Sequence, residues 1–103
     1  DLTPAQKRLV RLLQRLNFGR LENLVVVGGE PVFRPPPRTV HAIKIGGTNG
    51  PRAEAAIEDF PLTAPVQEML QRIDELGDGR VDRIDVRHGL PVAMEIEQTE
   101  APA

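Results

Sequence analysis

The chain has 103 residues, of which 40% are hydrophobic and 27% charged, enough for one globular domain with a single core. It contains no cysteine, which excludes disulfides, thiolate metal sites and cysteine nucleophiles. The formal net charge of −2 is unevenly distributed: residues 1–52 carry nine basic and three acidic side chains (+6), and residues 53–103 carry four and twelve (−8), a polarity that can steer association but does not specify a fold.

A helix is predicted at the start of the chain. Thr3 can cap its first turn, Pro4 suits the first helical position, and Gln6 stands where it completes a capping box. Gly19 is expected to stop the helix. Four leucines at helical spacing form the face that must be buried: Leu9, Leu12, Leu13 and Leu16.

A β-hairpin with its turn at Gly28-Gly29 is predicted next, and another with its turn at His88-Gly89 late in the chain. In the first strand of each hairpin, the first two apolar residues are three positions apart and the next two are two positions apart. Since alternate residues of a regular strand share a face, each strand needs one extra residue to keep all three on one face. We therefore expect a β-bulge near Glu22-Asn23 and another near Asp82-Arg83. The apolar positions are Leu21, Leu24 and Val26 in one strand and Val81, Ile84 and Val86 in the other.

The two hairpin segments are similar in sequence. Residues 19–32 align without gaps on residues 79–92 with six identities in fourteen positions. Upstream, after a three-residue difference in length, Leu12–Asn17 aligns on Met69–Asp74 with three more identities, whereas average composition would give about one or two over all these positions. A second helix is expected there, with Pro65 in its first turn. Duplication is the simplest interpretation, and convergence of two unrelated pieces is the alternative.

One helix–hairpin unit is marginal alone in water, so two units are expected to share a sheet. We predict an α+β fold, a tandem helix–hairpin repeat (αββ)2, with a four-stranded or larger antiparallel sheet and both helices on one face. The single domain, 1–103, comprises repeat one over about residues 3–45, a connecting loop over about 46–62, repeat two over about 63–97 and a disordered tail over 98–103.

The stretch between the repeats is not duplicated. Because proline has no backbone N–H, Pro35-Pro36-Pro37 must end the first return strand or place it at an edge. A loop over Gly46–Pro51 and a weak helical turn over Ala53–Ile57 are expected before the second repeat. Four residues indicate that a strand resumes after the prolines: Val40, Ala42, Ile43 and Ile45.

Nucleophilic catalysis needs a nucleophile, a base within reach and a group that orients the base. The chain has no serine, and its only histidines are His41 and His88. His88 is expected to be an exposed turn residue and His41 a surface or edge-strand residue, so we predict no enzyme. The alternative is an enzyme or small-ligand site centred on His41 and the Gly46–Gly50 loop, although that loop lacks the Lys-Ser/Thr of a P-loop.

A hard-cation site would need carboxylates at a suitable spacing. The acids near the C-terminus show no EF-hand spacing and alternate as on the solvated face of a strand, so we expect no metal and no cofactor. These acids are Asp82, Asp85, Glu95, Glu97 and Glu100.

The first predicted helix is basic. Lys7, Arg11 and Arg15 follow one another at i, i+4 spacing, with Arg8 beside them. Lys7, Arg11 and Arg15, together with Arg20, form a candidate contact for an anion or a nucleic acid. The other interpretations are a solvated helix face, or a surface that meets the acidic half of a neighbouring molecule, because the chain has few aromatic side chains on which bases could stack.

The pattern Leu16-Asn-Phe18-Gly19-Arg-Leu21, a valine strand and then Gly29-Glu-Pro31-Val32 resembles the YezD-like family of small uncharacterised bacterial proteins. The resemblance covers about residues 9–34 and, more weakly, 66–97, where an aspartate replaces the phenylalanine. It implies a helix, an aromatic-Gly pair and a hairpin that turns at a glycine, and it lends no catalytic residues.

These observations predict a small cytoplasmic protein that is a non-enzymatic protein–protein interaction or assembly module, acting on a protein partner or by self-association into a homo-oligomer. A nucleic-acid-binding protein that uses the basic helix is the alternative. The longest apolar run, Leu24–Val27, is far shorter than the about 20 residues that span a bilayer, so no membrane partner is expected. Since the chain begins at Asp1 rather than Met, a segment removed upstream stays an open alternative.

Overall fold

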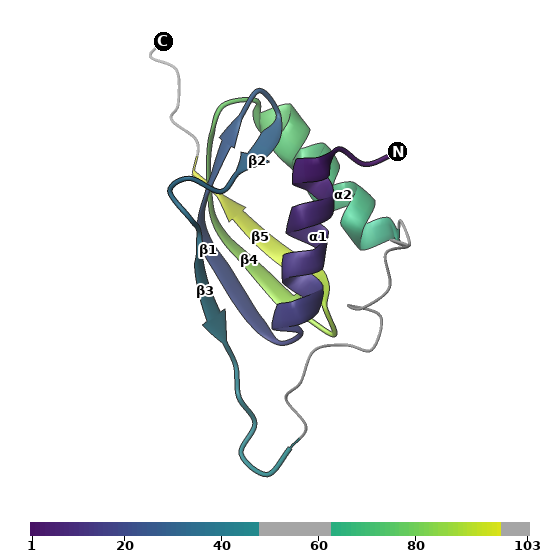
Figure 1. Cartoon of the computed structure of the whole chain (residues 1–103), viewed down its shortest axis with the longest axis vertical. Coiled ribbons are helices and arrows are strands. Elements are labelled where there is room, and N and C mark those ends of the chain that lie inside the picture. The colour runs from purple at the N-terminus through teal and green to yellow at the C-terminus, as the bar shows by residue number, and fades with distance from the viewer. Residues whose placement is uncertain (48–62, 98–103) are drawn as a thin grey trace.

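The computed structural model describes residues 1–47 and 63–97 (Figure 1). It confirms an α+β fold with two helices and a five-stranded antiparallel sheet. The order α β β β α β β differs from the predicted (αββ)2 by one additional strand, β3. The elements are α1 (Pro4–Leu16), β1 (Gly19–Val27), β2 (Glu30–Val32), β3 (Arg38–His41), α2 (Ala64–Leu76), β4 (Gly79–Arg87) and β5 (Leu90–Ile96).

Helix α1 begins at the predicted capping box. The backbone N–H of Gln6 donates to Oγ1 of Thr3 at 3.1 Å, and the N–H of Thr3 donates to Oε1 of Gln6 at 2.9 Å. The predicted stop is wrong, because the helix ends at Leu16 with Asn17, whose φ is 62°, as its C-cap, and Gly19 begins β1. Asparagine is one of the few residues other than glycine that tolerate a positive φ, so it can end a helix.

Both hairpins turn where predicted. β1 and β2 are joined by two residues, as are β4 and β5. All four turn residues have a positive φ, between 54° and 78°, as a type I′ turn requires: Gly28, Gly29, His88 and Gly89.

The first return strand is interrupted by the proline run. β2 pairs with the end of β1 and β3 pairs with its beginning, so both lie on the same side of β1. Prolines cannot donate to the ladder, and the strand resumes only after them. The predicted continuation beyond β3 is wrong for Ala42, Ile43 and Ile45, which lie outside the strand. Ile43 and Ile45 are 62% and 92% exposed.

In two units, α1 to β3 (the N-terminal unit) and α2 to β5 (the C-terminal unit), the helix, the long strand and the hairpin turn correspond at an offset of 60 residues. Both helices have 13 residues, and both β1 and β4 have nine. In the β1–β4 ladder Gly19 pairs with Val86 and Val26 pairs with Gly79, so exchanging the units leaves the register unchanged. The sequence alignment of the helices, which assumed an offset of 57, is therefore wrong by three residues.

Both expected strand irregularities occur. The β4–β5 register shifts between Val81 and Arg83, so Asp82 is the additional residue on β4. In β1, Asn23 adopts a φ of 59° at the corresponding place. As a result, all six apolar positions that step by three and then by two are buried: Leu21, Leu24, Val26, Val81, Ile84 and Val86.

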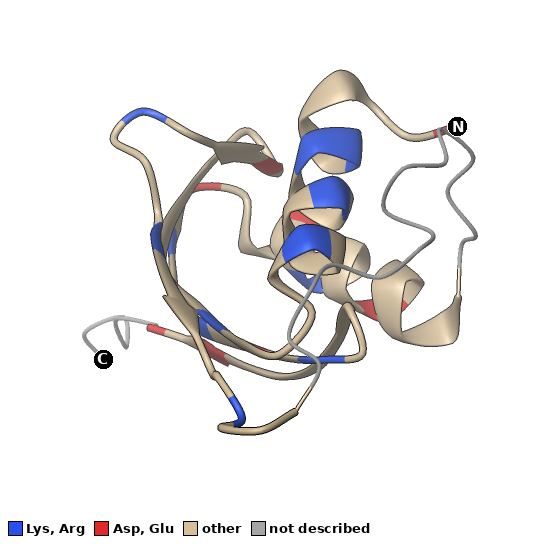
Figure 2. Ribbon diagram, turned by 60° about the horizontal axis from the view of Figure 1, so that its bottom comes forward, with Lys and Arg blue, Asp and Glu red and all other residues tan. Residues whose placement is uncertain are grey.

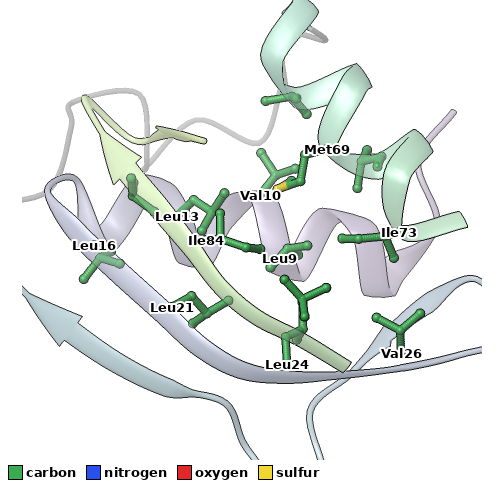
Figure 3. Packing of buried hydrophobic residues seen from close by; sticks show 14 residues of the cluster. Leu9, Val10, Leu13, Leu16, Leu21, Leu24, Val26, Met69, Ile73 and Ile84 are labelled. Atoms are coloured by element: carbon green, nitrogen blue, oxygen red, sulfur yellow. The ribbon is translucent and has the colours of Figure 1, made fainter. Parts of the chain in front are cut away.

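The core lies between the two helices and one face of the sheet (Figures 1 and 3). Val10 of α1 and Met69 of α2 lie next to each other in Figure 3, and both are 2% exposed. No described element covers the opposite face of the sheet, which we call the open face. The helix residues in the core are Leu9, Val10, Leu13, Leu16, Val66, Met69, Leu70 and Ile73.

Each hairpin turn is held by the end of the other unit's helix. The N–H of Gly29 donates to the carbonyl of Gly77 at 2.7 Å, and the N–H of Gly89 donates to the carbonyl of Asn17 at 2.9 Å. Both acceptors are C-cap residues, whose carbonyls have no partner within the helix. The two units therefore complete each other's helix ends.

Neither described helix is long and apolar enough to cross a membrane. The helical turn predicted at Ala53–Ile57, most of the connecting loop and the C-terminal tail lie outside the described residues.

Candidate functional site

Helix α1 presents its basic residues together. Lys7, Arg11 and Arg15 are all exposed, and the helix contains no acidic residue. The guanidinium carbon of Arg8 lies 4.4 Å from the centre of the Phe33 ring, a cation–π geometry. Figure 2 shows these basic residues along α1, whereas α2 carries acidic ones. The predicted stripe of Lys7, Arg11 and Arg15 thus exists as a surface.

Arg20 is not part of this stripe. It precedes Leu21, which is buried under the helices, and neighbouring strand residues point to opposite faces, so Arg20 lies on the open face. There its Nε donates to Oε2 of Glu22 at 2.9 Å. The four predicted contact residues are therefore divided between opposite sides of the molecule.

Glu22 sits between arginines on the open face. Besides the bond from Arg20, the Nε of Arg38 lies 3.6 Å from its Oε1. The hydrogen bond from Arg20 lowers the pKa of Glu22 and outweighs the opposing effect of desolvation, and the charges of Arg20, Arg38 and Arg83 act in the same direction as the bond. Glu22 is thus held in its ionised form.

Four of the five acids considered as cation ligands also belong to ion pairs. They lie beside two arginines of β4, an arrangement that neutralises them without a cation. No group of three histidine or acidic residues within 1–47 and 63–97 could hold a metal ion, and Glu100 lies outside these ranges. The pairs are Arg80–Asp82 (2.9 Å), Arg80–Glu97 (2.5 Å), Arg83–Glu95 (2.9 Å) and Arg83–Asp85 (3.5 Å).

The two histidines occupy exposed positions. His41 is the last residue of β3. His88 stands in the second turn, and its ring meets the ring of Phe18 edge-on, with the centroids 4.8 Å apart and the planes at 70°. Of the glycine loop, Gly46 and Gly47 are exposed, and the rest lies outside the described residues.

Sequence analysis missed an apolar groove between α2 and β5. The groove has a volume of about 760 Å³. Its polar lining includes Glu68 and Arg72, an i, i+4 pair on α2 whose charged atoms lie 3.5 Å apart. Its apolar lining includes Pro65, Met69, Pro91, Val92, Met94 and Ile96.

The groove lies beside a free strand edge. Among the described strands β5 pairs with β4 alone, so no strand within residues 1–47 and 63–97 pairs with its other edge. Val92 is 54% exposed although it lines an apolar surface. In the sequence, Val92, Met94 and Ile96 alternate as residues on the core face of a strand do. In the structure the β4–β5 register shifts between Asp85 and Val86, so Val92 is an extra residue of β5 and is left uncovered.

Comparisons of the chain with family models, with curated proteins and with solved structures found no match.

Proposed function

We propose that the chain is a cytoplasmic, non-enzymatic protein–protein interaction or assembly module that binds its partner at the α2–β5 groove. The observation that carries the proposal is the coincidence of an apolar groove with a free strand edge. An extended partner segment can hydrogen-bond to such an edge while its alternate side chains enter the groove.

The opposite edge of the sheet supports this choice. There β2 and β3 are short, and the run Pro35-Pro36-Pro37 separates them. Short, proline-interrupted edges are the usual protection against unwanted strand pairing. β5 has seven residues; Pro91 and the register shift at Val92 lie near its start, and the stretch from Ala93 to Ile96 contains no proline. The two edges are thus built differently, and β5 is the one that can accept a partner strand.

A photo-crosslinking experiment tests the proposal. Benzoylphenylalanine is placed at Val92 in one variant and at Thr39, an exposed residue of β3, in a control variant. We expect a defined adduct, identified by mass spectrometry, from position 92 and none from position 39. Equal labelling from both positions, or none from either, would contradict the proposal.

We also infer that the two units are copies of one ancestral helix–hairpin unit, akin to the YezD-like pattern. Two observations support duplication: the helices, long strands and turns correspond at an offset of 60 residues, and the β1–β4 register is the same when the two units are exchanged. The additional strand β3 is then a consequence of the prolines. Leu21 pairs with Thr39, whereas its counterpart Val81 pairs with Ile96, so the first return strand resumes three residues later than the offset alone would place it.

Nucleic-acid binding by α1 is the second candidate, favoured by the exposure of Lys7, Arg11 and Arg15 on one helix. Mobility shifts with duplex and single-stranded probes at about 50 mM salt would detect several phosphate contacts. The triple alanine variant at these positions should abolish the shift, and Arg20→Ala should not, because Arg20 lies on the open face. A wild-type protein that gives no shift would remove this candidate.

A further inference from the structure

The exposed edge of β5 is compatible with its own copy in one register. Directly opposite residues of an antiparallel pair lie on the same face. A register centred on Met94 sets this residue opposite itself and Ile96 opposite Val92 of the second copy. All three line the groove, and Val92 is the extra residue at the β4–β5 register shift. Glu95 then lies opposite Ala93, so no two acids face each other.

The neighbouring register is less favourable. Centred on Glu95, the pair would place two carboxylates directly opposite, and like charges in that position destabilise a sheet. Each Glu95 already binds Arg83 of its own chain at 2.9 Å, and the Met94-centred register leaves that ion pair in place.

The polar lining of the groove is also self-complementary. Glu68 and Arg72 lie one turn apart on α2, and their side chains are 68% and 58% exposed. A twofold axis beside α2 would make the two helices antiparallel, and in the proposed dimer Glu68 of one copy would face Arg72 of the other, and the reverse. A symmetric dimer requires a surface of this kind, which matches itself.

A similar operation already joins the two units inside the chain. β1 and β4 pair antiparallel in a register that stays the same when the two units are exchanged, and both helices lie on one face of the sheet. Pairing β5 with its copy extends the sheet in the same way and leaves all helices on one face.

Resting on the proposed function, we infer that the partner at the groove is a second copy of this chain, and that the two copies form a dimer by antiparallel β5–β5 pairing centred on Met94. An unrelated extended segment is the competing occupant.

Sedimentation velocity and light scattering of the full chain test the inference at protein concentrations up to about 1 mM, where even weak dimers are populated. We expect a reversible dimer of the 11.4 kDa chain. Val92→Lys should raise the Kd of the dimer by about tenfold or more, because burying a lysine charge without a partner is unfavourable. Val27→Lys is the matched control: Val27 is 56% exposed, close to the 54% of Val92, and does not line the groove.

A charge exchange tests the register. Glu68→Arg alone and Arg72→Glu alone should each weaken the dimer, since each sets like charges across the axis. The double variant Glu68→Arg/Arg72→Glu should restore it. Two damaging single changes without restoration would overturn the antiparallel arrangement.

The remaining outcomes separate the inference from the proposed function. A monomer at every concentration, or a dimer that Val92→Lys leaves intact, overturns β5–β5 pairing. If position 92 then still crosslinks to a different protein, the interaction module stands with another occupant. If position 92 crosslinks to nothing, both fail.

Discussion

At Gly29 the backbone of the first turn lies against α2. Its φ is 78°, and an added Cβ would lie 2.6 Å from Oδ1 of Asp74 and 3.3 Å from the Cα of Asp74. Gly28 also has a positive φ, 59°, but no atom lies within 4 Å of its added Cβ. His88 occupies the corresponding place in the second turn with a φ of 54°, so a larger residue is tolerated there.

We therefore expect Gly29→Ala to lower the free energy of unfolding by about 2–3 kcal/mol, through strain and the clash with Asp74. Gly28→Asn should cost less than about 1 kcal/mol, since asparagine accepts this conformation. Urea denaturation followed by far-ultraviolet circular dichroism measures both. Equal losses would show that the contact with α2 does not matter.

Glu22 gives the fold a pH dependence of known sign. Its pKa is lower in the folded chain than in the unfolded one, so its contribution is present above the unfolded pKa and is lost as the pH falls through the folded pKa. Glu22→Gln should be less stable than the wild type at neutral pH, and the difference should shrink as the pH falls below the unfolded glutamate pKa of about 4.3. Denaturation of both proteins across this range checks it, with Glu75→Gln on α2 as the control. A difference that persists unchanged at about pH 3 would contradict the assignment to ionised Glu22.

At the scale of the elements, the two helices have the same length and different N-caps. Oγ1 of Thr3 accepts the N–H of Gln6 and donates to Glu30 of β2 at 3.2 Å. Thr63, the N-cap of α2, makes no side-chain cap hydrogen bond, and its buried Oγ1 has no partner among the described residues.

Thr3→Ala should accordingly cost about 1 kcal/mol of stability, the usual value of a helix cap. Thr63→Ala should cost clearly less, because it removes no such bond. Thermal denaturation of the two single variants measures the contrast, and a larger effect at Thr63 would show that α2 is capped in another way.

Features set by near neighbours in the sequence could be predicted. The structure confirms the capping box at Thr3, both hairpin turns and the irregularly spaced buried residues of β1 and β4. All of these depend on spacings of a few residues. The end of α1 was misplaced because two residues only two positions apart, Asn17 and Gly19, both take a positive φ.

Features set by distant segments could not be predicted. The match of Leu13-Gln-Arg with Leu70-Gln-Arg suggested a gap in the repeat, yet in the structure Leu13 corresponds to Ile73, and both are 1% exposed or less. Burial fixes the helix register more strongly than identity does. The groove was missed for a related reason, since apolar alternation does not reveal which strand lies at the edge.

For the whole molecule, the shared core predicts a single unfolding transition. β1 and β4, the central strands, come from different units, and each turn depends on the other unit's helix. The calorimetric and van't Hoff enthalpies should therefore agree. The amides of β1 and β4 should exchange with solvent only by global unfolding, whereas those of the edge strand β3 should exchange faster. Two transitions would mean that the units are independent.

The reciprocal bonds between Gly29 and Gly77 and between Gly89 and Asn17 also have a topological consequence. Two chains that trade their C-terminal units would satisfy the same backbone bonds and bury the same core as one chain closed upon itself. The length of the connection between β3 and α2 thus governs the choice between a closed molecule and a domain-swapped pair, and shortening it should favour the swap.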